Sequence, residues 1–562
     1  MEGIPEHPLS AGGLCAVGQA TPMGLYDSQR LSGPLSGGQP ADWADVDQEI
    51  AQQLQQLVEQ KKTVRLVTAT VTSPTLQATI DDFLAQFSDG RHVVLDTVSS
   101  SAILDAHEKT HGARVLPHYL LDRAAVLVSF GADFLGTWIS PVEFTADWRT
   151  RRVPSEEHPD MSYHVQLESR MSLTGSNADV RFRIRPEDQG PLLGRLAEKV
   201  AALTGDAPAQ PLAPEAVAPI DSQDAVLSDL ASRLWKARGE CLVLCDSQDV
   251  DVQVLVNYIN HLLGNYTKTI DIERPSRQRQ GNDREVAQLI DELKAGQVGA
   301  LLVAGTDLSH NLPDRISFAE AVGNVPLVVS FAEREDDFAS LARFVCPDHH
   351  PLESWLDAEP VSGLVSLAQP TLRPLNNTRS VLESLALWSG RRETAYDIVR
   401  AHWRDKILPR HQRVKDFDEL WNLSLHDGFV EVEPEPVSAQ KFQMSAVKPL
   451  GPQAAPADYS LVLYHNVGLP DSRHAHNPWL QELPDPVTKV TWGNYISVSP
   501  ATAAEIGLTE GDVVRVEASS GGPSLELPAL VQPGQHDRVL GIALAYGVQG
   551  TDRFAEIGPQ WL

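Results

Sequence analysis

The sequence lacks an apolar run long enough to cross a membrane, and it has few cysteines. A membrane span takes about 20 consecutive apolar residues, and the ALLVAG run near Ala300 is far shorter. The 4 cysteines, Cys15, Cys241, Cys245 and Cys346, are scattered, and no CxxCxxC run occurs. A four-iron cluster needs about four thiolates. We therefore expect no direct membrane span and no iron–sulfur cluster held by this chain alone.

Basic residues and the features of a signal peptide are also scarce. The chain has 46 Lys and Arg against 75 Asp and Glu, a net charge of −29. This charge argues against nucleic acid and anionic lipid as partners, and it is compatible with a basic protein partner or simply with solubility. The N-terminal residues MEGIPEHPLSAGG contain no basic region followed by an apolar one, so we expect no signal peptide.

Apolar strands alternate with amphipathic helices through most of the 562 residues, which predicts an α/β fold with parallel sheets covered on both faces. We expect a first α/β domain at 41–204, a Pro/Ala-rich linker at 205–223 and a second α/β domain at 224–430. In CLVLC, alternation places Cys241 and Cys245 on one strand face, as core thiols. The expected strands are 64–71, 92–96, 124–131, 163–169, 241–245, 299–305 and 326–331, and the expected helices are 43–59, 75–87, 100–109, 190–203, 250–263, 284–295 and two between 380 and 423.

The C-terminal part has a different pattern. A Pro-rich linker at 431–456 leads to a domain at 457–562. There Ile496 and Val498 alternate as a strand, and 501–506 predicts a short helix that Gly507 stops. A turn at Gly511 then leads into a second strand.

This strand–helix–turn–strand unit resembles the C-terminal barrel of molybdopterin oxidoreductases. The string before it, N-x-W-L-Q-E-x-P-x-P-x-T-K-x-x-W-x-N within 473–494, resembles the molybdopterin-oxidoreductase-like subunit of alternative complex III, a bacterial quinol-oxidising membrane complex. The resemblance implies two nucleotide-fold-like parallel-sheet halves followed by a six-stranded β-barrel. Residues 1–40 resemble the end of the superfamily's iron–sulfur domain. In cluster-bearing relatives Cys15 would be the fourth ligand, and Val17 stands where many carry a basic residue. We expect 1–40 to be a truncated remnant of that domain.

The segment 167–190 resembles the superfamily's nucleotide-binding signature. In relatives the residues at Arg170 and Asp179 bind the guanine nucleotide of the cofactor, but an Arg and an Asp here could equally be an ion pair that braces a loop. The turns at Gly131 and Gly305 follow strands where a dinucleotide would approach a sheet. Both turns lack the asparagine and proline of the superfamily's G-x-N-P, which weakens an inherited pterin contact.

The resemblance places a further set of polar side chains where catalytic relatives present residues to the pterin. Their donors could bind phosphate and pterin oxygens, or they could brace a domain interface, which we favour. His474 and His476 have no third ligand at a suitable spacing, so we expect no metal there. The set is Arg473, His474, His476, Asn477, Trp479, Gln481 and Glu482.

Molybdenum needs a soft or anionic ligand at the start of a helix above the pterins, which by position falls within 96–107. No cysteine is present there, and Ser99, Ser100 and Ser101 are the available ligands. The interpretation we favour is that Asp96, Thr97 and Ser99 cap the helix that follows. A third family-like string, L-E-S-W-x-D at 352–357, contains Glu353, Trp355 and Asp357, for which we expect a structural role.

Taken together, the resemblance predicts a cofactor-free scaffold with no catalytic residues. Its implied partners are an iron–sulfur ferredoxin-like subunit, quinol-oxidising membrane subunits and a c-type cytochrome. They would hold it at the membrane on the periplasmic side. The alternative is an active oxidoreductase with molybdenum, two molybdopterin guanine dinucleotides and a serine ligand. A third reading is a free-standing remnant of a split gene.

Overall fold

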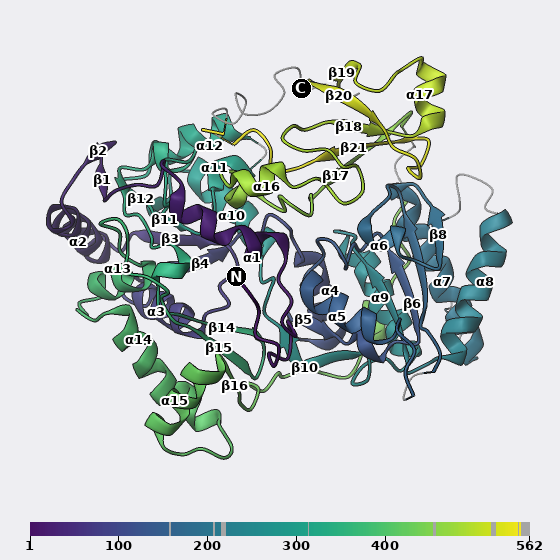
Figure 1. Ribbon diagram of the computed structural model, residues 1–562, viewed down its shortest axis with the longest axis horizontal. Coiled ribbons are helices and arrows are strands. Elements are labelled where there is room, and N and C mark those ends of the chain that lie inside the picture. Colours follow the sequence, from purple (N-terminus) through teal and green to yellow (C-terminus); the bar gives the residue numbers. More distant parts are fainter. Residues whose placement is uncertain are drawn as a thin grey trace.

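The computed structural model describes residues 1–156, 159–205, 208, 210–214, 221–312, 314–452, 457–518, 524–548 and 550–551. They form an α/β protein with two largely parallel sheets, one antiparallel sheet and a C-terminal domain (Figure 1). Among these residues, no helix combines the length and the apolar character that crossing a membrane requires.

The first sheet has seven strands in the order β2-β1-β13-β12-β11-β3-β4, and its pairs from β13 to β4 are parallel. Neighbouring residues of one strand enter opposite cores, because side chains alternate across a sheet. Leu66 packs under α2, α3 and α13, whereas Val67 packs under α10 and α12. The strands are β1 (Leu35–Ser36), β2 (Gln39–Pro40), β3 (Thr63–Thr68), β4 (Gly90–Val94), β11 (Val298–Ala304), β12 (Leu327–Ser330) and β13 (Phe344–Val345). The helices are α2 (Trp43–Glu59), α3 (Pro74–Leu84), α10 (Asp283–Lys294), α12 (Arg315–Val322) and α13 (Val381–Trp388).

The second sheet is parallel throughout, in the order β8-β7-β6-β9. Cys241 and Cys245 both lie in the core between this sheet and α7, α8 and α9, so the prediction of core thiols is confirmed. The strands are β6 (Val126–Phe130), β7 (Tyr163–Glu168), β8 (Val180–Arg183) and β9 (Cys241–Cys245). The helices are α4 (Ser101–His111), α5 (Pro141–Thr150), α6 (Leu173–Ser176), α7 (Gln189–Thr204), α8 (Asp221–Lys236) and α9 (Val250–Leu262).

Both parallel sheets take strands from either side of the predicted linker at 205–223. β3 pairs with β11 in the first sheet, and β6 pairs with β9 in the second. The linker therefore does not divide the two sheets. Local patterning identifies a parallel strand but not its neighbours, because parallel strands are joined by long crossovers. The α/β class and the parallel sheets are confirmed.

An antiparallel sheet that the sequence did not predict joins the two parallel ones, in the order β16-β15-β14-β10-β5. Its strands carry polar residues and proline, as in IDIERPS and LDAEPV, so they resemble loops in sequence. The strands are β5 (Leu116–Tyr119), β10 (Ile270–Ser276), β14 (Leu356–Val361), β15 (Leu364–Ala368) and β16 (Phe429–Glu431), and the helices α14 (Ala395–His402) and α15 (Phe417–Asp427) pack beside them.

The C-terminal domain lies above both parallel sheets in Figure 1, with α16 toward the first and β17 toward the second. The predicted strand, helix and second strand are confirmed, and Gly507 ends the helix with a φ of 68°. Its described residues hold five strands in the order β17-β21-β18-β20-β19, so a closed six-stranded barrel stays a prediction. The elements are β17 (Ser460–Tyr464), α16 (Pro478–Glu482), β18 (Ile496–Val498), α17 (Pro500–Ile506), β19 (Val513–Val516), β20 (Leu525–Val531) and β21 (Val539–Ala543).

The N-terminal segment contacts the antiparallel sheet through His7 and Ser366, then the C-terminal domain, and enters the first sheet as β1. Its helix α1 (Ala16–Ala20) begins after Cys15, which is exposed. Ala20 packs with Leu469 and Leu480 in one small core. The segment therefore serves as a structural link between the two parts, and its likeness to an iron–sulfur domain stays a prediction.

Candidate functional site

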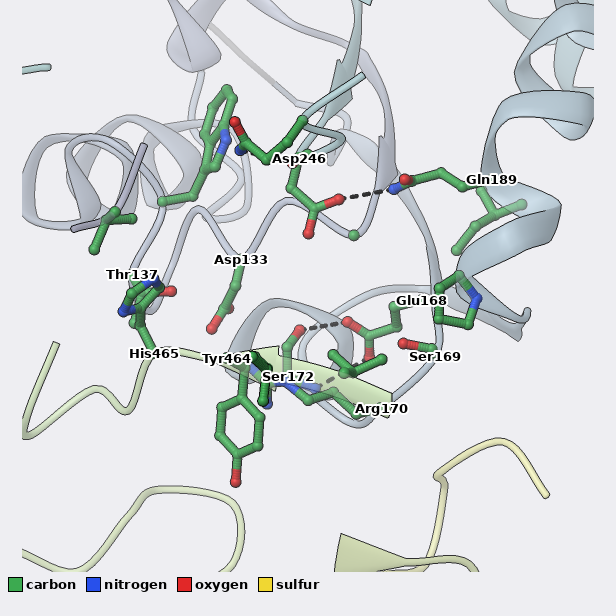
Figure 2. Close-up of a pocket in the computed structure, with 18 of the residues that line it drawn as sticks. Asp133, Thr137, Glu168, Ser169, Arg170, Ser172, Gln189, Asp246, Tyr464 and His465 are labelled. Atoms are coloured by element: carbon green, nitrogen blue, oxygen red, sulfur yellow. Dashed lines mark hydrogen bonds between the residues drawn. The ribbon is translucent and has the colours of Figure 1, made fainter. Parts of the chain in front are cut away.

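A cavity of ≈ 350 Å³ lies at the carboxyl ends of the second sheet (Figure 2). The strand β6 pairs with β7 on one side and with β9 on the other. Such a topological switch point is where open α/β sheets bind ligands. Gly131 ends β6 and Asp246 follows β9, while β17 of the C-terminal domain supplies Tyr464. We call this the second-sheet cavity.

Three carboxylates line the second-sheet cavity, and each bonds to the protein's own donors. Asp133 accepts hydrogen bonds from the backbone N–H and Oγ1 of Thr174 at 3.0 and 2.8 Å. Glu168 accepts from the backbone N–H of Ser172 at 3.1 Å and pairs with Arg181 at 2.5 Å.

The third carboxylate, Asp246, accepts from the side-chain amide of Gln189 at 2.7 Å, as Figure 2 shows. Burial raises the pKa of Asp246 to about 6, and burial likewise raises the pKa of Asp133. The three carboxylates share the cavity with the guanidiniums of Arg170 and Arg185, so its lining carries both signs of charge.

Arg170 lines this cavity as its position in the signature suggested, but Asp179 does not. The guanidinium of Arg170 stacks over the ring of Tyr464 with its carbon 3.9 Å from the ring centroid. Asp179 instead pairs with Arg152 at 2.7 Å and accepts the backbone N–H of His164 at 2.8 Å. The interpretation that Arg170 and Asp179 pair with each other is therefore wrong, although Asp179 does brace a loop through Arg152. The sequence could not identify Arg152, because it lies on another segment.

A second cavity, of ≈ 160 Å³, lies where the carboxyl ends of β11, β12 and β13 meet the C-terminal domain. We call it the first-sheet cavity. Gly305 ends β11 with a φ of 66°. Asp307 follows and caps the short helix α11 (Leu308–Asn311), accepting the N–H of His310 at 3.0 Å. Arg473 enters from the C-terminal domain and pairs with Asp471 at 2.6 Å.

The other predicted residues of the C-terminal domain mostly brace the chain. Asn477 caps α16 and donates to the carbonyl of Ala20 at 2.7 Å, and Gln481 donates to the carbonyl of Ala475 at 2.8 Å. Trp479 is 51% exposed and Glu482 is also exposed. His476 lines the first-sheet cavity, and burial lowers the pKa of His474.

Ser99 and Ser101, two serines of the candidate ligand cluster, form hydrogen bonds within the chain. Ser99 lines the second-sheet cavity, donates to Asp283 at 2.8 Å and accepts the N–H of Ser101 at 3.1 Å. The predicted cap is displaced, because Ser100 is the N-cap of α4 and Ser99 bonds the first helical N–H from one position earlier. Capping is wrong for Asp96, whose carboxylate accepts from Thr70 and from the N–H groups of 280–281. That loop is distant in the sequence, so no local pattern indicates it. Thr97 lines the cavity, and Ser100 precedes α4 without a side-chain cap.

The L-E-S-W-x-D string has a structural role. Glu353 forms a buried ion pair with Arg30 at 2.7 Å. Asp357 accepts hydrogen bonds from Ser73, Thr75 and the indole N–H of Trp403. Trp355 lies against Tyr396 and Trp421.

The sequence reasoning missed the carboxylates that dominate both cavities. Asp133, Glu168 and Asp307 each stand at the end of an apolar strand or within three residues of it. An acidic residue at that point is a usable signal, because parallel strands gather their carboxyl ends at one edge.

Two parallel sheets whose carboxyl ends face a β-rich C-terminal domain define the fold of the molybdopterin oxidoreductase superfamily. The predicted resemblance to that superfamily agrees with a curated relative and with a solved structure of the same fold. It is 23% identical over 600 residues to the menaquinone reductase, molybdopterin-binding-like subunit, of Nitratidesulfovibrio vulgaris, an alignment that covers 99% of this chain and 84% of that protein. Acetylene hydratase from Pelobacter acetylenicus shares the fold with a TM-score of 0.67 at 13% identity, over 96% of this chain and 88% of that one. No family model matches the chain.

Proposed function

We propose that this protein is a molybdopterin-oxidoreductase-like subunit of a membrane-associated, quinone-linked electron-transfer complex. In this proposal it acts as a scaffold without a pterin cofactor. The name of the menaquinone reductase subunit supports a quinone-linked complex. The resemblance at 473–494 supports a complex of the alternative complex III type. Its partners would be an iron–sulfur ferredoxin-like subunit, quinone-reacting membrane subunits and a c-type cytochrome on the periplasmic side.

One observation carries the cofactor-free part of the proposal. A dinucleotide's diphosphate binds backbone N–H groups that begin the helix or turn after a strand. Here such groups already donate to the chain's own carboxylates, which also repel phosphate. The pairs are Thr174 with Asp133, Ser172 with Glu168, Asp251 with Asp249 and His310 with Asp307, at 3.0, 3.1, 2.8 and 3.0 Å. This occupation of the donors supports a subunit that holds no pterin dinucleotide.

The test is metal and pterin analysis of the full chain made in a molybdenum-replete host, with iron and acid-labile sulfur assayed alongside. We expect neither molybdenum, tungsten nor pterin above background. Near-stoichiometric molybdenum with pterin dinucleotide would overturn the proposal in favour of the active oxidoreductase, and Ser99 and Ser101 would then be mutated as ligand candidates. Co-purification from the native membrane tests the scaffold role, which predicts capture of an iron–sulfur subunit.

Matched variants test separately whether the carboxylates keep a dinucleotide phosphate from the backbone N–H groups. Asp133→Asn and Asp307→Asn remove the negative charge next to the N–H donors. Asp229→Asn is the control, because its side chain is 57% exposed on α8. Guanosine diphosphate binding by calorimetry should be absent in the wild type and the control, and measurable in the double variant Asp133→Asn, Asp307→Asn. If the wild type bound guanosine diphosphate as tightly as the double variant, the carboxylates would no longer support a cofactor-free scaffold.

A further inference from the structure

A groove of ≈ 530 Å³ shares no lining residue with the two cavities described above. Its lining comes mainly from three segments, which are the L-E-S-W-x-D string, the loop 370–374 and the start of α14. Figure 1 shows α14 toward the lower edge of the molecule, away from the C-terminal domain. We call this the Trp355 groove.

Two aromatic rings line the Trp355 groove side by side. The ring centroids of Trp355 and Tyr396 lie 4.9 Å apart, and the ring planes meet at 59°. Trp421 is buried and does not line the groove, but it packs against both rings, at 6.1 Å from Trp355 and 5.9 Å from Tyr396. Trp421 therefore supports the two rings from the core and leaves them half-buried at the surface.

The polar atoms of these two rings have no partner in the protein. Within the part of the chain that the structure describes, neither the indole N–H of Trp355 nor the hydroxyl of Tyr396 forms a hydrogen bond, and both atoms reach solvent. Trp403 of the same core differs, because its indole N–H donates to Asp357 at 3.0 Å. Aromatic rings with free N–H and O–H donors fit a ligand that supplies carbonyl acceptors.

One charged group of the groove also lacks a counter-group. Arg373 is exposed and forms no ion pair with any residue that the structure describes. The carboxylates of the groove are already bonded. Glu353 pairs with Arg30 at 2.7 Å, and Glu383 accepts the N–H of Ala395 at the start of α14 at 2.8 Å. The charge left for a ligand is therefore positive.

These features distinguish among the ways in which proteins bind peptides. Strand addition needs a free strand edge, but the N–H groups at 371 and 372 both donate to the carbonyl of Leu352, at 2.8 and 3.3 Å. An amphipathic helix needs a continuous apolar groove, and Arg373 and Glu383 interrupt this one. A polyproline II segment has no internal hydrogen bonds, so its carbonyl groups are free, and it docks on aromatic-lined grooves.

We propose that the Trp355 groove binds an extended, proline-containing segment of a partner protein, with an acidic residue of that segment against Arg373. A proline ring packs on Trp355 and Tyr396, whose N–H and O–H groups donate to carbonyl groups of the segment. The inference goes beyond the proposed function and does not depend on it, because the groove shares no residue with either cavity.

Calorimetry with synthetic peptides on the full chain tests this proposal. The probes are a polyproline peptide that carries one glutamate, the same peptide with lysine in place of the glutamate, and a Gly-Ser peptide with the glutamate. We expect the polyproline peptide with glutamate to bind about threefold more tightly than the one with lysine, the effect of an exposed charge pair. It should bind about tenfold more tightly than the Gly-Ser peptide, which loses more conformational freedom on binding.

Tyr396→Phe and Trp355→Phe each keep an aromatic ring and remove one donor. Each should weaken binding of the polyproline peptide with glutamate about fivefold, the effect of one hydrogen bond. Tyr26→Phe and Trp479→Phe are the matched controls. These side chains lie outside the groove and are 80% and 51% exposed, so both controls should bind as the wild type does.

Arg373→Gln should abolish the preference for glutamate over lysine. If Trp355→Phe fails to fold, Tyr396→Phe still decides, because it removes a single oxygen atom that bonds to nothing in the described chain. Three results would each overturn the proposal: no binding of the polyproline peptide with glutamate at millimolar concentration, equal binding of the Gly-Ser peptide, or undiminished binding by Tyr396→Phe.

Discussion

Arg30 and Glu353 form a buried, bidentate ion pair across 323 residues of sequence, with Nη2–Oε2 and Nη1–Oε1 distances of 2.7 and 3.3 Å. Glu353 also accepts the N–H groups of His350 and Leu375. The pair ties the N-terminal segment to the loop before β14. Two strings that resemble different family motifs are thus halves of one structural contact.

Glu353→Gln should destabilise the fold by about 3 kcal/mol, because it leaves the buried guanidinium of Arg30 without a full counter-charge. Urea unfolding followed by circular dichroism measures this. Arg515→Met is the control, since the Arg515–Glu526 pair is about 60% exposed on both sides and should contribute under about 1 kcal/mol. Equal losses of unfolding free energy in the two variants would contradict a stabilising role for the Arg30–Glu353 ion pair.

Trp403→Phe should cost about 1–3 kcal/mol, because Trp403 is fully buried and its indole N–H donates to Asp357 at 3.0 Å. The substitution leaves a buried carboxylate with one donor fewer. Trp479→Phe, at a site 51% exposed, should change the free energy of unfolding little. If Trp403→Phe left the free energy of unfolding unchanged, the serine and threonine donors alone would satisfy Asp357.

Gly131→Ala should destabilise more than Gly390→Ala. Both glycines have a positive φ, 75° and 83°, so both alanines bear a left-handed backbone cost of about 1–2 kcal/mol. Only at Gly131 would the new Cβ overlap the Asp246 carboxylate, whereas Gly390 faces open space. Thermal unfolding of the two variants isolates that contact, and identical shifts would argue against it.

Acid should destabilise the protein through buried histidines. Burial lowers the pKa of His164 to about 4 and that of His107 to about 3. Because the unfolded chain binds protons at these sites below about pH 6.5 and the folded chain does not, stability is lost as the pH falls from about 6.5 toward 4. His164→Phe should reduce this loss by up to about 3 kcal/mol, measured as urea midpoints between pH 7 and 4. His426→Phe is the control, since that side chain is 87% exposed.

Strands such as β9 and β11 and helices such as α9 and α10 were predictable because each has its own apolar period. The pairing of β3 with β11 was not, because nothing local to either strand encodes its partner. The same limit applies to the site. Arg170 was found from its motif, but its partner Tyr464 lies on another domain.

The sequence by itself determined the α/β class, the superfamily resemblance and the acidic, cysteine-poor composition. Only the tertiary structure decided which N–H groups the carboxylates occupy, as with Asp133 on Thr174 and Asp307 on His310. It also decided that Asp336 and Asp348 line one cavity with Arg473. The physical reason is that burial and charge proximity are properties of the folded arrangement, and they set both ligand fit and proton affinity.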